Sequence, residues 1–255
     1  MIDLHCHIVP DVDDGAQTEA ESRAMLAQAA SIGITELAAT SHYSGDAWRR
    51  YPEALEKLRQ LAEEHHIKIH AGAEYDFSRL EEAEQLQTLG DSSYVLIDFV
   101  TPYISPNAIA QRCEDLLNRK YKLLIAHPER LFPADKLKVL QSLAEQGAYF
   151  QLNAGSFLGN FGRGAQRQAE QLLKLGLCHC VASDAHNAGS TRGFCLKKCH
   201  DYLIEHHNCN IADRLVLINP QRILADQYPF PVVEPAAGAE SSWWGRLKNL
   251  FRPRN

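Results

Sequence analysis

The chain has no long apolar run, since no stretch reaches the roughly 18 apolar residues that a membrane-spanning helix needs. Its first residues have the pattern of a strand, with neither the basic region nor the apolar run of a signal peptide. It also has no internal repeat. Seven cysteines is an odd number, and without an export signal we expect reduced thiols in a cytoplasmic protein.

Positive charge is scarce outside the C-terminal end. The 255 residues carry a net charge of −6, and 240–255 holds four basic residues and one acidic residue. Taking this +3 away leaves −9 on the rest of the chain. Such an acidic body lacks the charge that neutralises phosphates, so we expect no nucleic-acid partner.

Short apolar runs alternate with helix-length amphipathic stretches over most of the chain. The predicted strands are Met1–Val9, Glu36–Thr40, Ile67–Ala73, Tyr94–Val100, Lys122–Ala126, Ala148–Leu152 and Cys178–Ala182. The predicted helices are Glu19–Ser31, Tyr51–His65, Glu81–Leu89, Ala108–Asn118, Ala134–Glu145 and Gly164–Leu175. This alternation favours a parallel sheet, either closed into a barrel or doubly wound, and about seven units over ~220 residues suit a barrel.

Polar residues that can bind metal gather at the ends of the predicted strands. His5 and His7 point to the same side of the first strand, because side chains alternate along a strand. Later predicted strands are followed by His42, Glu74, His127, Asp184 and His186. In a β/α barrel the carboxyl ends of the strands converge on one face, so these residues become neighbours.

With Asp14, which follows the first strand, the set holds five histidines and three carboxylates. Any one of these histidines alone is more simply a polar strand end, but the joint pattern predicts a metal site. One zinc ion takes three or four protein ligands, so two or three divalent ions are expected. Mixed imidazole and carboxylate ligands suit manganese, iron or zinc. We interpret the following as surface residues: His65, His66, His200, His206 and His207. The pattern does not decide whether His70 is a metal ligand or lies too far back from the strand end.

Five segments in this order resemble the PHP (polymerase and histidinol phosphatase) superfamily: MIDLHCHIVPDVDDG, ATSHY, GAEY, AHPER and SDAHN. Within it they are similar to the manganese-dependent bacterial tyrosine-protein phosphatases encoded with capsule and exopolysaccharide genes. The resemblance covers Met1 to about Tyr228. It implies a distorted (β/α)7 PHP-type barrel with a multinuclear metal site at the C-terminal ends of the strands.

The resemblance also implies a ligand set for two or three Mn²⁺ ions, with iron or zinc as alternatives. The implied ligands are His5, His7, Asp14, His42, Glu74, His127, Asp184 and His186. Among them, Glu74 and Asp184 are similar to the bridging carboxylates of the family.

One position departs from the family pattern. The family has a further metal-binding histidine just after the fourth strand, where this sequence reads DFVTPY. Asp98, Tyr103 or a water are the alternatives for that space. A dinuclear or partly loaded centre is therefore an open alternative.

Arg130 and Arg192 would lie on loops above the metal face, three and six residues after His127 and His186. Guanidinium groups match phosphate oxygens in bidentate fashion, although spacing alone equally fits ordinary surface arginines. Both match arginines that hold phosphate in the family. We therefore expect both to bind phosphate, with a metal-bound water as the nucleophile, because divalent ions lower the pKa of bound water.

The segment from Cys113 to Arg119 matches the C-x5-R string of cysteine-dependent tyrosine phosphatases, but we reject that chemistry. The segment has helical periodicity and no glycine, and Glu114 and Asp115 would repel phosphate. A reactive cysteine needs positive surroundings instead.

Two cysteine pairs, Cys178-x-Cys180 and Cys195-x3-Cys199, leave open a second metal site. The position of Cys178 and Cys180 on a predicted strand favours buried thiols.

The predicted domains are a barrel (1–228), a Pro/Ala/Gly/Ser-rich linker (229–242) and a C-terminal tail (243–255). The tail has an apolar stripe at helical spacing, opposite basic residues, formed by Trp243, Trp244, Leu247, Leu250 and Phe251. Such a helix binds an anionic membrane surface or docks on a partner. The alternatives are a frayed tail and one that packs back on the barrel.

The predicted function is a metal-dependent protein-tyrosine phosphatase acting on a tyrosine kinase that regulates capsule or exopolysaccharide synthesis. The tyrosine preference, and a membrane tyrosine kinase as substrate, follow from the resemblance alone. We expect a cytoplasmic protein, placed at the inner face of the membrane if the tail binds there. One alternative is a PHP phosphatase for a small phosphomonoester such as histidinol phosphate. Another is a weakly active or inactive barrel that serves as a docking partner of the polysaccharide machinery.

Overall fold

The computed structural model describes residues 1–83, 85–99, 106–131, 136–189 and 191–232. Its strands pair in parallel throughout and form two sheets. The first sheet consists of β1 (Ile2–Cys6), β2 (Glu36–Ala39) and β3 (Lys68–Ala71). The second consists of β4 (Glu74–Asp76), β5 (Tyr94–Asp98), β6 (Lys122–Ala126), β7 (Tyr149–Asn153) and β8 (Cys180–Ala182). The predicted α/β class with parallel strands is therefore confirmed.

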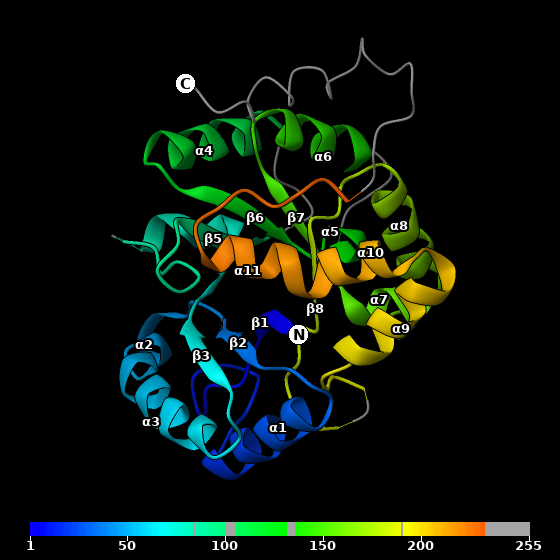
Figure 1. Ribbon diagram of the computed structural model, residues 1–255. Coiled ribbons are helices and arrows are strands. Elements are labelled where there is room, and N and C mark those ends of the chain that lie inside the picture. Colours follow the sequence, from blue (N-terminus) through cyan, green and yellow to red (C-terminus); the bar gives the residue numbers. More distant parts are fainter. Residues whose placement is uncertain (84, 100–105, 132–135, 190, 233–255) are drawn as a thin grey trace, which may run out of the picture.

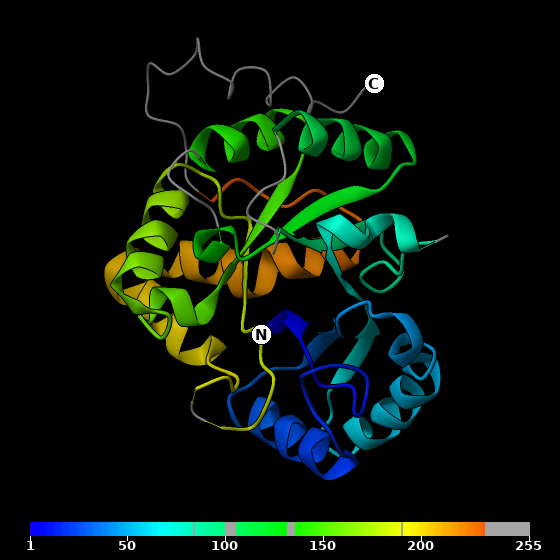
Figure 2. The same ribbon diagram turned by 180° about the vertical axis from the view of Figure 1, so that it is seen from behind.

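The helices divide between two lobes, one around each sheet (Figures 1 and 2). The first lobe contains α1 (Glu19–Ser31), α2 (Gly45–Trp48) and α3 (Tyr51–Glu63). The second contains α4 (Pro106–Asn118), α5 (Pro128–Leu131), α6 (Lys136–Glu145), α7 (Ala154–Phe157) and α8 (Gly162–Lys174). In the described residues after β8, the chain forms helices that the sequence patterns did not predict: α9 (Leu196–His206), α10 (Cys209–Asp213), π-helical η2 (Arg214–Ile218) and α11 (Asn219–Leu224).

The predicted third strand, Ile67–Ala73, corresponds to β3, which ends at Ala71, and a further strand that was not predicted follows in the other sheet. β3 pairs with β2, whereas β4 begins at Glu74 and pairs with β5. Gly72 lies at the break between β3 and β4, where a Cβ atom would stand 2.8 Å from Cγ2 of Thr40. Its amide donates a hydrogen bond of 2.9 Å to the Tyr51 hydroxyl. The absence of a side chain thus lets the backbone pass closely from the first sheet to the second.

The described strands do not close into one hydrogen-bonded ladder, so the predicted barrel is not closed. The two sheets meet instead through isolated parallel bridges, Cys6 with Ala185 and His42 with Glu74. At the first seam the His7 amide donates to the Ala185 carbonyl at 2.8 Å, and at the second the Tyr43 amide donates to the Glu74 carbonyl at 2.9 Å. Both seams therefore run through residues predicted to bind metal.

The predicted helix Glu81–Leu89 is wrong. The chain forms a short 3₁₀ helix, η1 (Phe77–Glu82), and no regular element in the described residues between it and β5. Leu86 and Leu89 are buried, which explains the apolar periodicity. The Gln87 amide donates to the Tyr75 hydroxyl and the Leu89 amide to the Tyr94 carbonyl. Tertiary partners therefore satisfy this backbone without a helix.

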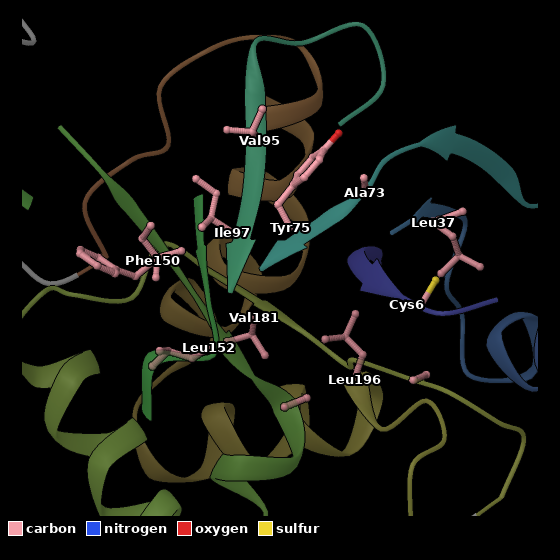
Figure 3. Packing of buried hydrophobic residues seen from close by; sticks show 14 of the residues in the cluster. Cys6, Leu37, Ala73, Tyr75, Val95, Ile97, Phe150, Leu152, Val181 and Leu196 are labelled. Atoms are coloured by element: carbon pink, nitrogen blue, oxygen red, sulfur yellow. The ribbon is translucent and has the colours of Figure 1, made fainter. Parts of the chain in front are cut away.

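Alternation along the strands separates two layers of the core. Outward residues of the second sheet, such as Ile97, Phe150 and Val181, pack beneath the helices (Figure 3). Inward residues form a second cluster with β1, and Ile223 of α11 joins it. Toward the C-terminal ends of β5, β7 and β8 the inward side chains change from apolar to polar: Asp98, Gln151, Asn153 and Asp184. The polar site is therefore built on top of an apolar interior.

A cavity of about 620 Å³ lies at the opposite end of the second sheet. Tyr121, Tyr149 and His179, at the starts of β6, β7 and β8, are among the residues that line it. It is therefore separate from the predicted metal face.

Several predictions concern residues outside the described part of the chain, namely Tyr103, the linker from residue 233 onward and the tail at 243–255. Among the helices that are described, none combines the length and the apolar character required to cross a membrane.

Candidate metal centre

The eight predicted ligands lie at the C-terminal ends of the strands, and the structure brings all of them together. They form three overlapping donor groups: His7, Asp14, His42 and His186; His5, His7 and Asp184; and His5, Glu74 and His127. Within each group the donor atoms lie within 4.8 Å of one another. The arrangement has the donor chemistry of a centre for several divalent ions.

The histidines of β1 form the middle of the cluster. Nε2 of His5 and Nε2 of His7 are 3.2 Å apart, and Oδ1 of Asp184 lies 3.5 and 3.4 Å from them. β1 has one residue more than β2 between two paired positions, Asp3 with Leu37 and Cys6 with Ala39. Such a bulge re-aims side chains and is common beside active sites.

Glu74 faces two of the donor groups at once. Its Oε1 lies 3.0 Å from Nε2 of His127. Its Oε2 lies 3.3 Å from Nε2 of both His5 and His7, and 3.1 Å from Nδ1 of His42. A carboxylate whose two oxygens face different groups has the geometry of a bridging ligand.

The group of His7, Asp14, His42 and His186 lies nearest to solvent. Oδ1 of Asp14 is 3.5 Å from Nε2 of His42 and 3.3 Å from Nε2 of His186. The side chains of Asp14 and His42 are 55% and 41% exposed, whereas Glu74 is 1% exposed. A substrate therefore has access to the cluster from this side.

Further polar residues hold the ligand histidines in one orientation. Nδ1 of His5 donates to Oε1 of Gln151 at 2.8 Å, and Nδ1 of His7 lies 2.6 Å from Oδ2 of Asp13. These contacts leave Nε2 of each ring directed into the cluster. Metal-binding histidines commonly have their other ring nitrogen held by a polar group in this way. Sequence reasoning missed both roles, although a glutamine within the apolar run of β7 was a signal for Gln151.

His127 and Asp184 have left-handed backbone conformations, with φ of 30° and 55°. Such conformations cost on the order of 1–3 kcal/mol in residues other than glycine and concentrate at functional sites. Each residue comes just after a strand, β6 or β8, and turns its side chain toward the cluster.

Buried polar atoms without partners show that the residues fit a bound cation. Oδ1 of Asp98, Nδ1 of His127 and Nε2 of His186 are buried and form no hydrogen bond with any residue that the structure describes. Buried polar atoms normally have such partners, so each is available to a ligand. Asp98 Oδ1 lies 3.8 Å from His127 Nδ1, and burial raises the pKa of Asp98 to about 6. Asp98 is thus a ninth candidate ligand, as one of the alternatives weighed for the DFVTPY segment.

The charges of the cluster depend on one another. Burial acts to raise the pKa of Glu74, but the charge of His5 and the hydrogen bond from His127 outweigh it and hold the pKa well below its usual range. Burial acts to lower the pKa of His127, yet the hydrogen bond to Glu74 and the charge of Asp98 raise it to about 9. A cation bound here replaces protons as the source of positive charge.

Both predicted phosphate-binding arginines contact carboxylates of the cluster. Nη1 of Arg130 donates to Oδ2 of Asp184 at 2.5 Å, and Nη1 of Arg192 donates to Oδ2 of Asp14 at 3.1 Å. Asn153, which sequence reasoning missed, donates to the same Asp184 oxygen at 3.1 Å. The two guanidinium groups therefore lie at the edge of the donor groups. Arg192 is on a loop as predicted, whereas Arg130 belongs to the short helix α5 rather than to a loop.

Other histidines lie outside the donor groups. The ambiguous His70 is bonded through Nε2 to Oε2 of Glu36 at 2.7 Å. His66 and His206 are exposed, and the following are partly exposed: His65, His200 and His207.

The cysteines do not form a second centre in the described residues. No donor group found there contains a cysteine. Cys178, Cys180 and Cys199 are buried free thiols, as expected. Cys113 is buried in α4, and burial raises the pKa of its thiol to about 12, which disfavours the thiolate that cysteine-based catalysis requires.

Comparison with known families matches residues 1–225 to the family described as capsular polysaccharide synthesis, CpsB/CapC. The chain is 35% identical over 209 residues to tyrosine-protein phosphatase YwqE of Bacillus subtilis, covering 76% of this chain and 80% of that protein. It is 31% identical to tyrosine-protein phosphatase CpsB of Streptococcus pneumoniae, covering 89% of this chain and 99% of that protein.

The fold is also similar to a solved structure from work on YwqE of Bacillus subtilis and CpsB of Streptococcus pneumoniae, which are described as unique metal-dependent tyrosine phosphatases. The TM-score is 0.82 at 32% identity, covering 90% of this chain and 96% of that chain.

Proposed function

This chain belongs to the CpsB/CapC family of capsular polysaccharide synthesis, and we propose that it is a metal-dependent protein-tyrosine phosphatase. Its reaction is hydrolysis of the phosphomonoester of a phosphotyrosine side chain. The relatives named for this activity align with most of this chain. The donor groups and both arginines of this chain supply the chemistry that the reaction needs.

The two arginine–carboxylate contacts are the observation that carries the proposal. Asp184 and Asp14 each belong to a donor group, and each holds one guanidinium at its edge. Guanidinium groups bind phosphate oxygens in bidentate fashion. A phosphate at this edge would therefore meet two arginines on one side and the metal ligands on the other.

The proposed ligands are the eight residues of the three donor groups, with Asp98 as a further one. Manganese is the proposed ion, at two or three per chain, with iron and zinc as alternatives. Divalent ions, when bound, supply Lewis-acid catalysis and activate water for attack on phosphorus. Adding each ion in turn to metal-stripped protein and measuring the phosphatase activity tests the choice of metal.

The residues of the chain divide the remaining tasks. Arg130 and Arg192 bind the non-bridging phosphate oxygens and offset their charge, which would otherwise repel the attacking oxygen. Asn153 and Arg130 together fix one oxygen of Asp184. The leaving group is a phenolate, whose conjugate acid has a pKa of about 10, so it departs more readily than the alkoxide of a serine.

The first test compares a phosphotyrosine peptide, a phosphoserine peptide and histidinol phosphate as substrates of EDTA-stripped protein with and without manganese. We expect manganese to restore activity on phosphotyrosine, and the variant His42→Ala to remain inactive. Activity on histidinol phosphate alone would move the protein to the small-phosphomonoester alternative. Absence of activity on all three, with bound metal demonstrated, would favour the docking alternative. The named relatives and the retained donor groups do not favour either one.

The second test addresses the arginines. Arg130→Ala and Arg192→Ala should each lower kcat/KM on phosphotyrosine by about 10²-fold, the usual size for loss of one donor to developing charge. Arg222→Ala is the matched control, because its guanidinium stacks on Phe230 away from the donor groups. An equal loss in all three variants would argue against phosphate binding by the first two.

We further propose that the protein substrate is a membrane tyrosine kinase of the polysaccharide machinery and that the tail at 243–255 brings the enzyme to the inner face of the membrane. The support is the family description and the apolar stripe of the tail opposite basic residues. Deleting residues 240–255 should lower co-sedimentation with anionic vesicles or with the kinase. Unchanged co-sedimentation would rule the idea out.

A further inference from the structure

Phe161 lies beside the candidate phosphate site and remains 38% exposed. Its ring centroid is 4.2 Å from the guanidinium carbon of Arg130, which is close enough for a cation–π contact. Arg130 in turn donates to Asp184 of the donor groups. A continuous line of contacts thus runs from the proposed metal ligands through the arginine to an aromatic ring at the surface.

The turn between α7 and α8 places this ring. Gly159 and Gly162 have φ of 78° and 84°, which side chains other than glycine rarely adopt, and they bracket the turn. The Asn160 amide donates to the Gly155 carbonyl at 2.8 Å. A Cβ atom on Gly155 would stand 2.8 Å from Cε2 of Phe161, so the ring packs directly on glycine backbone. Glycines therefore appear where the ring needs room and where the turn needs left-handed backbone.

Burial of Phe161 against the barrel would remove more apolar surface from water, yet the turn holds the ring partly exposed next to a polar, charged centre. In a phosphomonoester bound by Arg130, the ester oxygen is bonded directly to the phosphorus atom. An aryl group attached to that oxygen extends far enough to meet a ring beside the arginine, whereas the single methylene of phosphoserine does not. Paired aromatic rings attract each other beyond the area that they bury.

We propose that Phe161 is a specificity-determining residue whose ring forms a wall for the aryl group of the phosphotyrosine substrate. The proposal rests on the proposed function and adds the residue that distinguishes aryl from alkyl phosphomonoesters. Because the contact forms with bound substrate and persists in the transition state, its loss raises KM more than it lowers kcat.

The test measures binding as well as turnover. Metal-loaded wild type and Phe161→Ala are titrated with phenylphosphonate and with methylphosphonate, which resist hydrolysis, and kcat and KM are measured on a phosphotyrosine peptide. We expect Phe161→Ala to weaken phenylphosphonate binding on the order of tenfold, the effect of losing one aromatic pair and its apolar contact. Methylphosphonate binding should change much less. Phe161→Tyr, which keeps the ring, should restore aryl binding.

The matched control is Phe230→Ala, because Phe230 is also an exposed ring, 44% exposed, stacked at 3.9 Å on an arginine, Arg222. It should leave binding of both phosphonates unchanged. Equal weakening of both phosphonates by Phe161→Ala would show that the ring only supports Arg130, and unchanged binding of both would show no role; either outcome overturns the inference. A wild type inactive on phosphotyrosine would instead overturn the proposed function.

Discussion

Gln151 is buried in β7 and accepts a hydrogen bond from Nδ1 of His5 at 2.8 Å. Its amide group donates to the Leu152 carbonyl at 2.8 Å, which fixes which end of the side chain faces the histidine. The His5 ring is thereby held with Nε2 toward Glu74 and Asp184. Partners of this kind set both the orientation and the basicity of a ligand histidine.

Gln151→Leu should therefore weaken metal binding by about 10- to 100-fold while the fold is retained. Calorimetric titration of stripped protein with Mn²⁺ measures the affinity. Gln146→Leu serves as the control, because Gln146 contacts only Ser142 among the described side-chain partners and lies after α6. An affinity equal to that of the wild type would contradict the orienting role.

His179 is a buried histidine unrelated to the metal centre. Its Nδ1 accepts a hydrogen bond of 3.0 Å from the Phe150 amide, and burial lowers its pKa to about 4. Between about pH 6.5 and 4 the unfolded chain binds a proton at this residue that the folded protein does not bind. The free energy of unfolding therefore falls as the pH falls through this interval.

The expected contribution of His179 to this loss is about 3 kcal/mol, from a pKa difference worth ~1.4 kcal/mol per unit. His179→Asn keeps an acceptor for the Phe150 amide but cannot take up a proton, so its stability should depend less on pH. Urea unfolding at pH 7 and pH 4.5 compares the two proteins. If the free energy of unfolding changes with pH by the same amount in both proteins, His179 is not the cause of the pH dependence.

Among the elements, the turn after β1 is most tightly fitted to the site. The Gly15 amide donates to Oδ1 of Asp13, and the Ala16 amide donates to the His7 carbonyl. A Cβ atom on Gly15 would stand only 2.0 Å from the His7 carbonyl oxygen, which is backbone and cannot move aside alone. The turn and the strand that carries His7 must therefore shift together if residue 15 has a side chain.

Gly15→Ala should consequently lower stability by about 2 kcal/mol, as overpacking does, and weaken metal binding at least tenfold. Gly164→Ala is the control, because nothing lies within 4 Å of its Cβ position and it belongs to α8. That substitution should stabilise the protein slightly, since alanine favours a helix. Thermal unfolding measures the stability of both variants, and titration with Mn²⁺ measures their metal affinity. Equal stability and equal affinity in the two variants would contradict the close packing of Gly15 on the His7 carbonyl.

For the whole molecule, the donor groups connect two sheets that backbone bridges join only weakly. His5, His7 and His42 belong to or follow strands of the first sheet, and Glu74, His127 and Asp184 belong to or follow strands of the second. A bound ion therefore contacts both lobes. Ligands that bind only the folded state stabilise it in proportion to their affinity and concentration.

Removing the metal with EDTA should lower the melting temperature. Manganese at 100 times its dissociation constant contributes about 2.7 kcal/mol, which for a domain of this size corresponds to roughly 5–10 °C. Scanning calorimetry of stripped and reloaded protein measures the shift, and His42→Ala should show a smaller one. A melting temperature independent of metal would mean that the ions do not connect the lobes.

The sequence was sufficient for the fold class and for the eight residues that the structure gathers into the three donor groups. Strand and helix periodicities located most elements, because burial of one face imposes a period on the apolar residues. His5, Glu74 and Asp184 could be found because polar residues at strand ends stand out against apolar runs. The departure at Asp98 was visible too, although its closeness to His127 was not.

Only the tertiary structure decided features that depend on contacts between distant segments. The predicted helix at 81–89 failed since Tyr75 and Tyr94 satisfy that backbone, and no local pattern encodes such partners. The break at Gly72 was hidden because it arises from close packing against Thr40. The roles of Gln151, Asn153 and Phe161 depend on His5, Asp184 and Arg130, which are remote in sequence. Periodicity in the sequence indicates which face of an element is buried. The packing of elements that are distant in the sequence determines which residues contact one another on that face.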